Sequence, residues 1–168
     1  RKKPVIESII TINNNMYEYN VKVVKVVDGD TVDVDIDLGF GMTYKKQRVR
    51  LMGIDTPESR TRDKVEKLFG KASKKHLKNL MEQAEQLTLV SHDKGKFGRI
   101  LGELFSYHNV GHPVHEVHFS INQQMIDDHH AVDYAGGNKE EIQEQHMQHR
   151  TLLIEKGVVT QEDIDKVK

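Results

Sequence analysis

The fold of this chain is decided by the stretch MYEYNVKVVKVVDGDTVDVDIDL, residues 16–38. Residues 16–27 are rich in β-branched and aromatic side chains, which is typical of a strand. Gly29 can adopt the positive φ of a tight turn. Residues 31–38 then alternate without a break, so their apolar side chains share one face and their aspartates share a solvated face. The apolar positions are Val32, Val34, Ile36 and Leu38. The stretch therefore predicts an antiparallel hairpin.

Further elements extend this hairpin into a barrel. A turn at residues 39–41 and a strand over 43–54 complete an antiparallel meander, and apolar residues at helical spacing predict a helix over 71–84. The remaining expected elements are strands over 86–91 and 98–106, helices from Ser120 to about His129 and from Asn138 to about Glu155, and a last turn or two after Thr160. Five short strands with a helix after the third are typical of an OB fold, which often binds oligonucleotides. We expect an α+β fold, mainly β: a five-stranded Greek-key barrel with about three helices, one after the third strand and the others C-terminal.

Length and composition suit one soluble domain. The 168 residues, 36 % hydrophobic and 30 % charged, can bury a core. We expect a single domain over 1–168, with the core in 16–135 and a helical extension in 138–168. The chain contains no apolar run long enough for a membrane span, and its start lacks the apolar stretch of a secretory signal. No membrane association and a monomer are expected. A cytoplasmic location is slightly favoured, and a secreted mature form stays open.

The charge is uneven along the chain. Residues 1–119 contain 20 Lys and Arg against 16 Asp and Glu, whereas residues 120–168 contain 5 against 10, for a net charge of −1. A bound polyanion would therefore need a local basic patch in the first part.

Two carboxylates are placed where strands are expected to begin or end, and a third follows in the next loop. Asp30 follows a turn, and Asp55 precedes the Thr56-Pro57 pair that ends a strand. Two such carboxylates, the Thr56 carbonyl and water suit Ca²⁺ or Mg²⁺. Glu58 can reach a water beside the metal and act as a general base. Arg50 and Arg99 offer guanidiniums that match phosphate oxygens, where charge grows as water attacks. These residues together indicate a phosphodiester-cleaving enzyme.

The same residues resemble the staphylococcal (micrococcal) nuclease family, also called thermonucleases. The resemblance covers roughly residues 20–135 and consists of Asp28-Gly-Asp-Thr31, Arg50-x₄-Asp55-Thr-Pro-Glu58, and Gly98-Arg99 after an aromatic residue. It implies Ca²⁺ bound by Asp30, Asp55 and the Thr56 carbonyl, Glu58 activating or orienting the attacking water, and Arg50 and Arg99 on the scissile phosphate. It also implies cleavage of DNA and RNA that leaves 3′-phosphates, with single strands preferred.

A further set of residues is predicted to contact nucleic acid: Arg60, Arg62, Lys64, Lys96, Phe97 and Tyr134. The basic residues belong to loops that can steer phosphates. Phe97 stands where many members of the family have Tyr, and Tyr134 is the candidate for stacking a base. The segment 107–119 is longer than the family pattern implies, and the chain is less basic than well-known members.

Two alternatives remain open. The first is a non-catalytic OB-type module that binds single strands or proteins; degenerate members of the family lose acids or arginines, and here none is lost. The second is a zinc site at His112, His115 and His118, which Pro113 disfavours because it prevents a regular helix. The other histidines, His129, His130, His146 and His149, are expected on helix surfaces.

Overall fold

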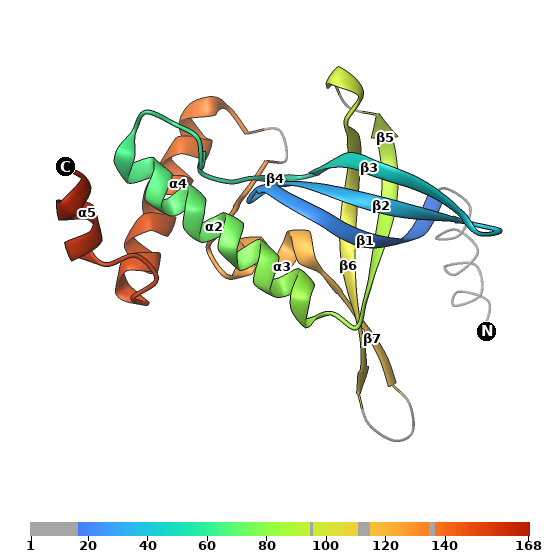
Figure 1. The fold of residues 1–168 in the computed structure, drawn as a ribbon. Helices are drawn as coiled ribbons and strands as arrows, with labels where there is room; N and C mark the ends of the chain where they lie inside the picture. The colour runs from blue at the N-terminus through green and yellow to red at the C-terminus, as the bar shows by residue number, and fades with distance from the viewer. Residues whose placement is uncertain (1–16, 95, 111–114, 135–136) are drawn as a thin grey trace, which may run out of the picture.

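The computed structural model describes residues 17–94, 96–110, 115–134 and 137–168. Five strands form a barrel (Figure 1): β1 Tyr17–Asp28, β2 Thr31–Gly39, β3 Met42–Leu51, β5 Gln86–Lys94 and β6 Ile100–Val110. They are hydrogen-bonded in the order β3-β2-β1-β5-β6, and β6 also pairs in parallel with β3, which closes the barrel. This is the arrangement of a five-stranded OB-type barrel, so the predicted fold class is confirmed.

Three short strands lie outside the barrel. β7, His115–Ser120, pairs antiparallel with the second half of β6, and the two extend away from the barrel as a hairpin (Figure 1). β4, Ile54–Asp55, and β8, Val132–Asp133, form a ladder of two residue pairs. The hairpin accounts for the length of segment 107–119, because β6 continues to Val110 instead of ending near Ser106.

Four α-helices are found in the described part of the chain: α2 Lys64–Gln83, α3 Ile121–Asp127, α4 Lys139–Glu155 and α5 Gln161–Val167. A 3-10 turn, η1, spans Lys96–Gly98. The turns expected after Thr160 form a helix of their own, which explains the count of four. Ser120, Asn138 and Thr160 each accept a backbone N–H of the helix that follows, as N-cap residues do.

The start of α2 differs from the sequence prediction. The helix begins at Lys64 instead of near residue 71, because Asp63 caps it and accepts the backbone N–H groups of Val65 and Glu66, each at 3.0 Å. Gly70 therefore lies inside the helix. The basic segment 60–67, expected as a loop, is a loop only up to Asp63.

The main core lies inside the barrel and beneath α2. Val32, Val34 and Ile36 are buried in it together with Leu77 of α2. Leu38 continues the alternation of β2 but is 43 % exposed, because β2 and β3 extend past the barrel as a long hairpin (Figure 1).

A second, smaller core joins the C-terminal helices to α2. Phe69 of α2 packs with Leu153, Val159 and Ile164. The guanidinium of Arg150 lies 5.2 Å from the centre of the Phe69 ring, within range of a cation–π contact. The helical end of the molecule is thus attached through the first turns of α2.

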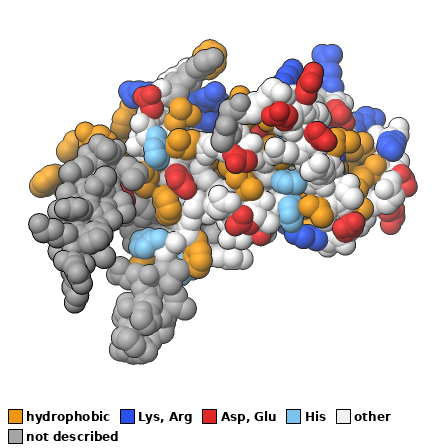
Figure 2. Space-filling view, turned by 180° about the vertical axis from the view of Figure 1, so that it is seen from behind, with side chains coloured by type: hydrophobic (Ala, Val, Ile, Leu, Met, Phe, Trp, Pro, Cys, Tyr) orange, Lys and Arg blue, Asp and Glu red, His pale blue; other side chains and the backbone are white. Residues whose placement is uncertain are grey.

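The surface of the helical end carries charges of both signs. On the face opposite to that of Figure 1, acidic and basic side chains are mixed there, with histidines among them (Figure 2). None of the described helices is both long and apolar enough to cross a membrane. The net charge of −1 is a sum over regions that differ in their local charge.

A histidine pair connects α2 to the segment after α3. His130 is 4 % exposed, so the expectation that it lies on a helix surface is wrong. It stacks on His76, with ring centroids 4.2 Å apart, and Nε2 of His76 lies 2.6 Å from Oδ2 of Asp128. Ser73 donates a hydrogen bond to the His130 carbonyl at 2.7 Å. Burial, with a further contribution from His76, lowers the pKa of His130 to about 4.

We expect the free energy of unfolding to fall as the pH is lowered from about 6.5 to about 4. His130 has a pKa of about 4 in the folded protein and an ordinary value of 6.5 when unfolded, so the unfolded chain takes up the proton first. The stabilisation is complete above pH 6.5 and is lost through this window, by up to about 3 kcal/mol. The pKa of Asp128 is lowered from its ordinary value of 3.8. The stabilisation that Asp128 contributes is therefore lost only below about pH 4, outside this window.

Urea denaturation between pH 4 and pH 8 measures this effect. His130→Asn removes the larger contribution and should reduce the slope, and His149, whose pKa burial also lowers, should leave a smaller slope in the variant. His118→Asn, at an exposed position of β7, should leave the slope unchanged. A parent protein that keeps its full stability down to pH 4.5 would contradict the assignment.

Candidate active site

The three predicted carboxylates lie beside strand ends. Asp30 directly precedes β2, Asp55 ends β4, and Glu58 follows three residues later. Oδ1 of Asp30 accepts a hydrogen bond from the Thr31 hydroxyl at 2.9 Å, and its Oδ2 accepts one from the Thr56 backbone N–H at 3.3 Å. The second bond ties the β1–β2 turn to the segment after β4, so the two acid-bearing loops are neighbours.

Arg50 connects two of these acids. Its Nη2 lies 3.2 Å from Oδ2 of Asp30 and 3.7 Å from Oδ1 of Asp55. Its Nη1 donates to the Leu51 carbonyl at 2.7 Å, which orients the guanidinium. The other oxygen of Asp55 lies 2.7 Å from Nε2 of His146 on α4. Asp30, Arg50 and Asp55 are therefore in direct contact, and a histidine from the far end of the chain joins them.

Three arginines, Arg48, Arg50 and Arg99, lie near the place where β3 and β6 pair and close the barrel. Arg48 is paired with Asp33 at 2.8 Å on the outer face, whereas Arg50 turns to the acids. Leu101 of β6 is the partner of Arg50, and Arg99 precedes the first residue of that strand. Arg99 lines the same depression as Arg48 and Asp33. Arg99 therefore lies at the barrel closure near Arg48, whereas Arg50 contacts the acids.

α2 approaches both acid loops closely because it has small residues there. A Cβ added to Gly70 would overlap the carbonyl group of Glu58. One turn further, Ser73 faces the β1–β2 turn: a Cβ added to Gly29 would lie 2.8 Å from the Cβ of Ser73. In addition, the carboxylate of Glu66 accepts the backbone N–H of Glu58 at 3.3 Å. One helix therefore positions the loop of Asp30 and the loop of Glu58.

Burial and neighbouring acids raise the pKa values of Asp30 and Glu58. Burial raises the pKa of Asp30 above its usual value, although the positive charge of Arg50 opposes the shift. Partial burial raises the pKa of Glu58, and the charges of Asp28, Asp30 and Asp55 add to this effect. A carboxylate with a raised pKa accepts a proton more readily near neutral pH.

Sequence reasoning missed two residues of this cluster. Asp28 is a fourth acid that acts on Asp30 and Glu58, and its place in the Asp-Gly-Asp triplet was the available signal. His146 is 8 % exposed and bonded to Asp55, so its expected position on a helix surface is wrong. No local pattern links His146 to Asp55, because 91 residues separate them.

The donor set suits a hard cation that also takes water and backbone oxygen. The hydroxyl of Thr56 is buried without a hydrogen-bond partner, and the backbone of the same residue bonds Asp30. Such an orphaned polar atom suits a bound water or ion nearby. Within the described residues, no three His, Asp or Glu side chains are arranged to hold a metal by themselves. A cation between Asp30 and Asp55 would therefore need further oxygen ligands, as Ca²⁺ and Mg²⁺ do.

Three of the basic residues predicted to contact nucleic acid lie at the start of α2. Arg60 and Arg62 are exposed in the loop before α2, and Lys64 is the first residue of that helix. The side chain of Lys96 lies outside the described residues. The same holds for His112 and for the side chain of His115 in the suggested zinc site.

The two aromatic candidates are exposed. Phe97, at 94 % exposure, has a positive φ of 64° between β5 and β6 and shares a depression of about 480 Å³ with Arg99. Tyr134, at 53 % exposure, donates its backbone N–H to the carbonyl of Gly53 at 2.9 Å. This bond places Tyr134 beside the turn that precedes Asp55.

Known proteins match most of this region. A sequence profile described as "Staphylococcal nuclease homologue" matches residues 48–156, which include Arg50, Asp55, Glu58 and Arg99. A thermonuclease of Staphylococcus hyicus is 35 % identical over 92 residues, which are 52 % of this chain and 49 % of that protein. A thermonuclease of Staphylococcus intermedius is 39 % identical over 81 residues, 46 % of this chain and 43 % of that protein. The matched parts are about half the length of these relatives.

We expect Gly70→Ala to destabilise the protein even though alanine favours helices. The exchange gains up to about 1 kcal/mol in helix propensity. The new methyl group would, however, overlap the backbone of Glu58, and overpacking typically costs about 1–3 kcal/mol. Urea denaturation should show a net loss of about 1 kcal/mol.

Lys67→Ala is the control for this substitution, because Lys67 is exposed on the same helix. It should change the stability by less than about 0.5 kcal/mol. A Gly70→Ala protein more stable than the parent would show that α2 does not press on the Glu58 loop.

Proposed function

The chain belongs to the staphylococcal nuclease family, and from this we propose that it is a Ca²⁺-dependent, sugar-nonspecific nuclease. It hydrolyses phosphodiester bonds of DNA and RNA and leaves 3′-phosphates. The observation that carries the proposal is the contact of Arg50 with both Asp30 and Asp55, next to a Glu58 whose pKa is raised. Both curated relatives named above are thermonucleases.

In the proposed reaction, water attacks phosphorus and the bond to the 5′ oxygen breaks. Glu58 accepts the proton of the attacking water, a role that its raised pKa supports. The 5′ oxygen leaves with a proton from solvent, and the phosphate stays on the 3′ oxygen. Arg50 and Arg99 bind the non-bridging oxygens, where negative charge grows in the transition state.

Asp30, Asp55 and the Thr56 carbonyl would hold the Ca²⁺ ion, which supplies positive charge beside the phosphate when bound. The buried, unpartnered hydroxyl of Thr56 supports this assignment. So does the raised pKa of Asp30, because burial and neighbouring acids disfavour its negative charge and a bound cation would compensate for this. His146 fixes the orientation of the Asp55 carboxylate from α4.

The substrate is proposed to be single-stranded by preference. Phe97 and Tyr134 are exposed aromatic rings, and unpaired bases can stack on such rings without sequence preference. The basic residues proposed to attract phosphates are Arg60, Arg62, Lys64 and Lys96. We propose that the protein acts as a monomer and that residues 138–168 are an extension of one domain.

Glu58→Gln should lower the rate of single-stranded DNA cleavage in Ca²⁺ by about 10²–10⁴-fold, because it removes the proton acceptor while keeping the shape of the side chain. Cleavage of a labelled oligonucleotide measures this rate, and EGTA should abolish cleavage by the parent. Glu18→Gln, the same charge change at an exposed site on β1, should cleave normally. A parent that binds the strand in millimolar Ca²⁺ without cutting it is a binding module instead.

Ca²⁺ should raise the midpoint of thermal unfolding, because an ion that binds only the folded state stabilises it. The gain is about 2.7 kcal/mol at a concentration 100-fold above the Kd. Asp30→Asn and Asp55→Asn should lose most of this shift. Asp33→Asn, whose carboxylate pairs with Arg48, should keep it. An equal Ca²⁺ shift in all three variants would place the ion elsewhere.

A further inference from the structure

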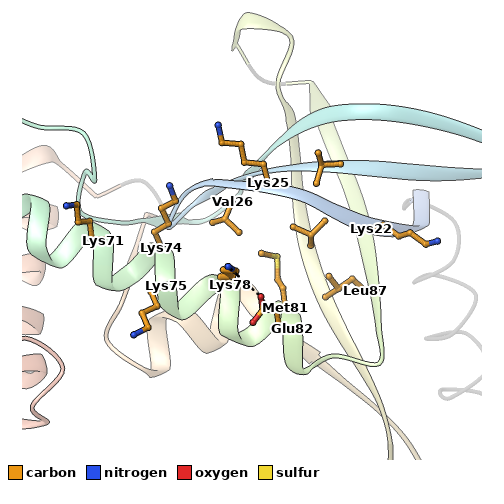
Figure 3. A pocket seen from close by; sticks show the side chains of 12 residues that line it. Lys22, Lys25, Val26, Lys71, Lys74, Lys75, Lys78, Met81, Glu82 and Leu87 are labelled. Carbon is orange, nitrogen blue, oxygen red and sulfur yellow. Dashed lines mark ion pairs between the residues drawn. The ribbon is translucent and has the colours of Figure 1, made fainter.

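A lysine-lined groove of about 770 Å³ lies between β1 and α2 (Figure 3). Its charged lining residues are six lysines and one glutamate: Lys22 and Lys25 from β1, and Lys71, Lys74, Lys75, Lys78 and Glu82 from α2. Val26, Met81 and Leu87 contribute apolar surface. Lys25, Lys71 and Lys74 extend to the same side, whereas Lys75 extends to the other side of α2 (Figure 3).

The groove arises from the path of β1. This strand pairs with β5 over Tyr17–Val21, and its pairing with β2 shifts register between Val23 and Lys25. A bulge of this kind bends a strand and breaks its alternation. The side chains from Lys22 to Lys25 are consequently all exposed. Lys25, which follows the bulge, is one of the lysines that line the groove beside α2.

The lysines of α2 form a stripe next to its buried face. The buried positions of this region are Gly70, Ser73, Leu77 and Met81, and the lysines follow at positions 71, 74, 75 and 78. Like charges three or four residues apart destabilise a helix by a few tenths of a kcal/mol per pair. Within the described residues, the stripe has one ion pair, Lys78 with Glu82 at 3.8 Å. The helix therefore retains an arrangement that local stability disfavours.

The groove begins where the acid loops end. Lys71 follows Gly70, which touches the Glu58 backbone, and Lys74 follows Ser73, which touches the β1–β2 turn before Asp30. From Lys71 to Lys78 the helix covers about 10 Å. A linear polyanion that passes the acid cluster can therefore continue along the groove past several ammonium groups.

We propose that this groove binds the sugar–phosphate backbone of the nucleic-acid strand beyond the bond that is cleaved. This proposal rests on the proposed nuclease function and adds a second contact region to it. The positive charge lines a concave groove in which Val26, Met81 and Leu87 are buried, and its partly exposed apolar residues, Val23 and Val24, have short side chains. A strand fits this shape better than a flat anionic lipid surface, which needs a protruding apolar face.

The test is the salt dependence of binding to a labelled 20-nucleotide single strand, measured by fluorescence anisotropy. All proteins contain Glu58→Gln so that the strand stays intact in Ca²⁺. Lys25→Gln/Lys74→Gln should lower the slope of log K against log salt by roughly 1.4, because each phosphate contact to a single strand contributes about 0.7. The Kd should rise on the order of tenfold at 0.1 M salt. For a 4-nucleotide strand, too short to occupy both the site and the groove, the Kd should change far less.

Lys139→Gln/Lys166→Gln is the matched control, with the same change of charge on α4 and α5 and an unchanged slope expected. If the groove variant keeps the parental slope and Kd while the parent binds and cleaves, the groove proposal is wrong and the nuclease function stands. If the protein without Glu58→Gln neither binds nor cleaves nucleic acid, the proposed function fails first. The groove would be assigned to lipid if two results were found together. Phosphatidylserine vesicles would bind the parent but not the Lys25→Gln/Lys74→Gln protein, and these two proteins would bind the strand equally.

Discussion

The close approach of α2 to two loops is the constraint on which the site depends. Gly70 leaves no space between the helix and the Glu58 backbone, and Ser73 lies against the β1–β2 turn. A barrel of this type has loops at its rim that could adopt many conformations. Here one rigid element sets the position of both, so that acids from different parts of the chain lie in one place.

Side chains from two distant elements hold the acid cluster together. Arg50 of β3 lies between Asp30 and Asp55, and His146 of α4 bonds Oδ2 of Asp55. The positive charge of Arg50 limits the repulsion between the carboxylates, although burial keeps the pKa of Asp30 raised. The contact of His146 also joins the C-terminal helices to the site. The packing of α4 and α5 on Phe69 therefore bears on the geometry of Asp55.

The distribution of charge reconciles a near-neutral chain with the proposed polyanionic substrate. The net charge is −1, yet the groove beside α2 contains six lysines and one glutamate. The Debye length is about 8 Å at physiological salt, so the nearby lysines set the electrostatic potential of the groove. The mixed charges of the helical end (Figure 2) have no comparable effect. One face of α2 packs against the acid-bearing loops through Gly70 and Ser73, and a neighbouring face carries the lysines of the groove.

The sequence by itself determined the barrel and predicted five members of the acid and arginine set, namely Asp30, Arg50, Asp55, Glu58 and Arg99. The alternation in residues 31–38, the turn residues and the spacing of Arg50, Asp55 and Glu58 are local patterns, and local patterns follow from periodicity and backbone preference. Periodicity does not predict capping or tertiary packing. For this reason the sequence did not predict the start of α2, the β6–β7 hairpin or the burial of His130. Only the tertiary structure decided that His146 meets Asp55, that Arg99 lies near Arg48, and that lysines of β1 and α2 line one groove. These are contacts between residues far apart in the chain, and they form because the closed barrel and the helix packed on it fix the relative positions of their elements.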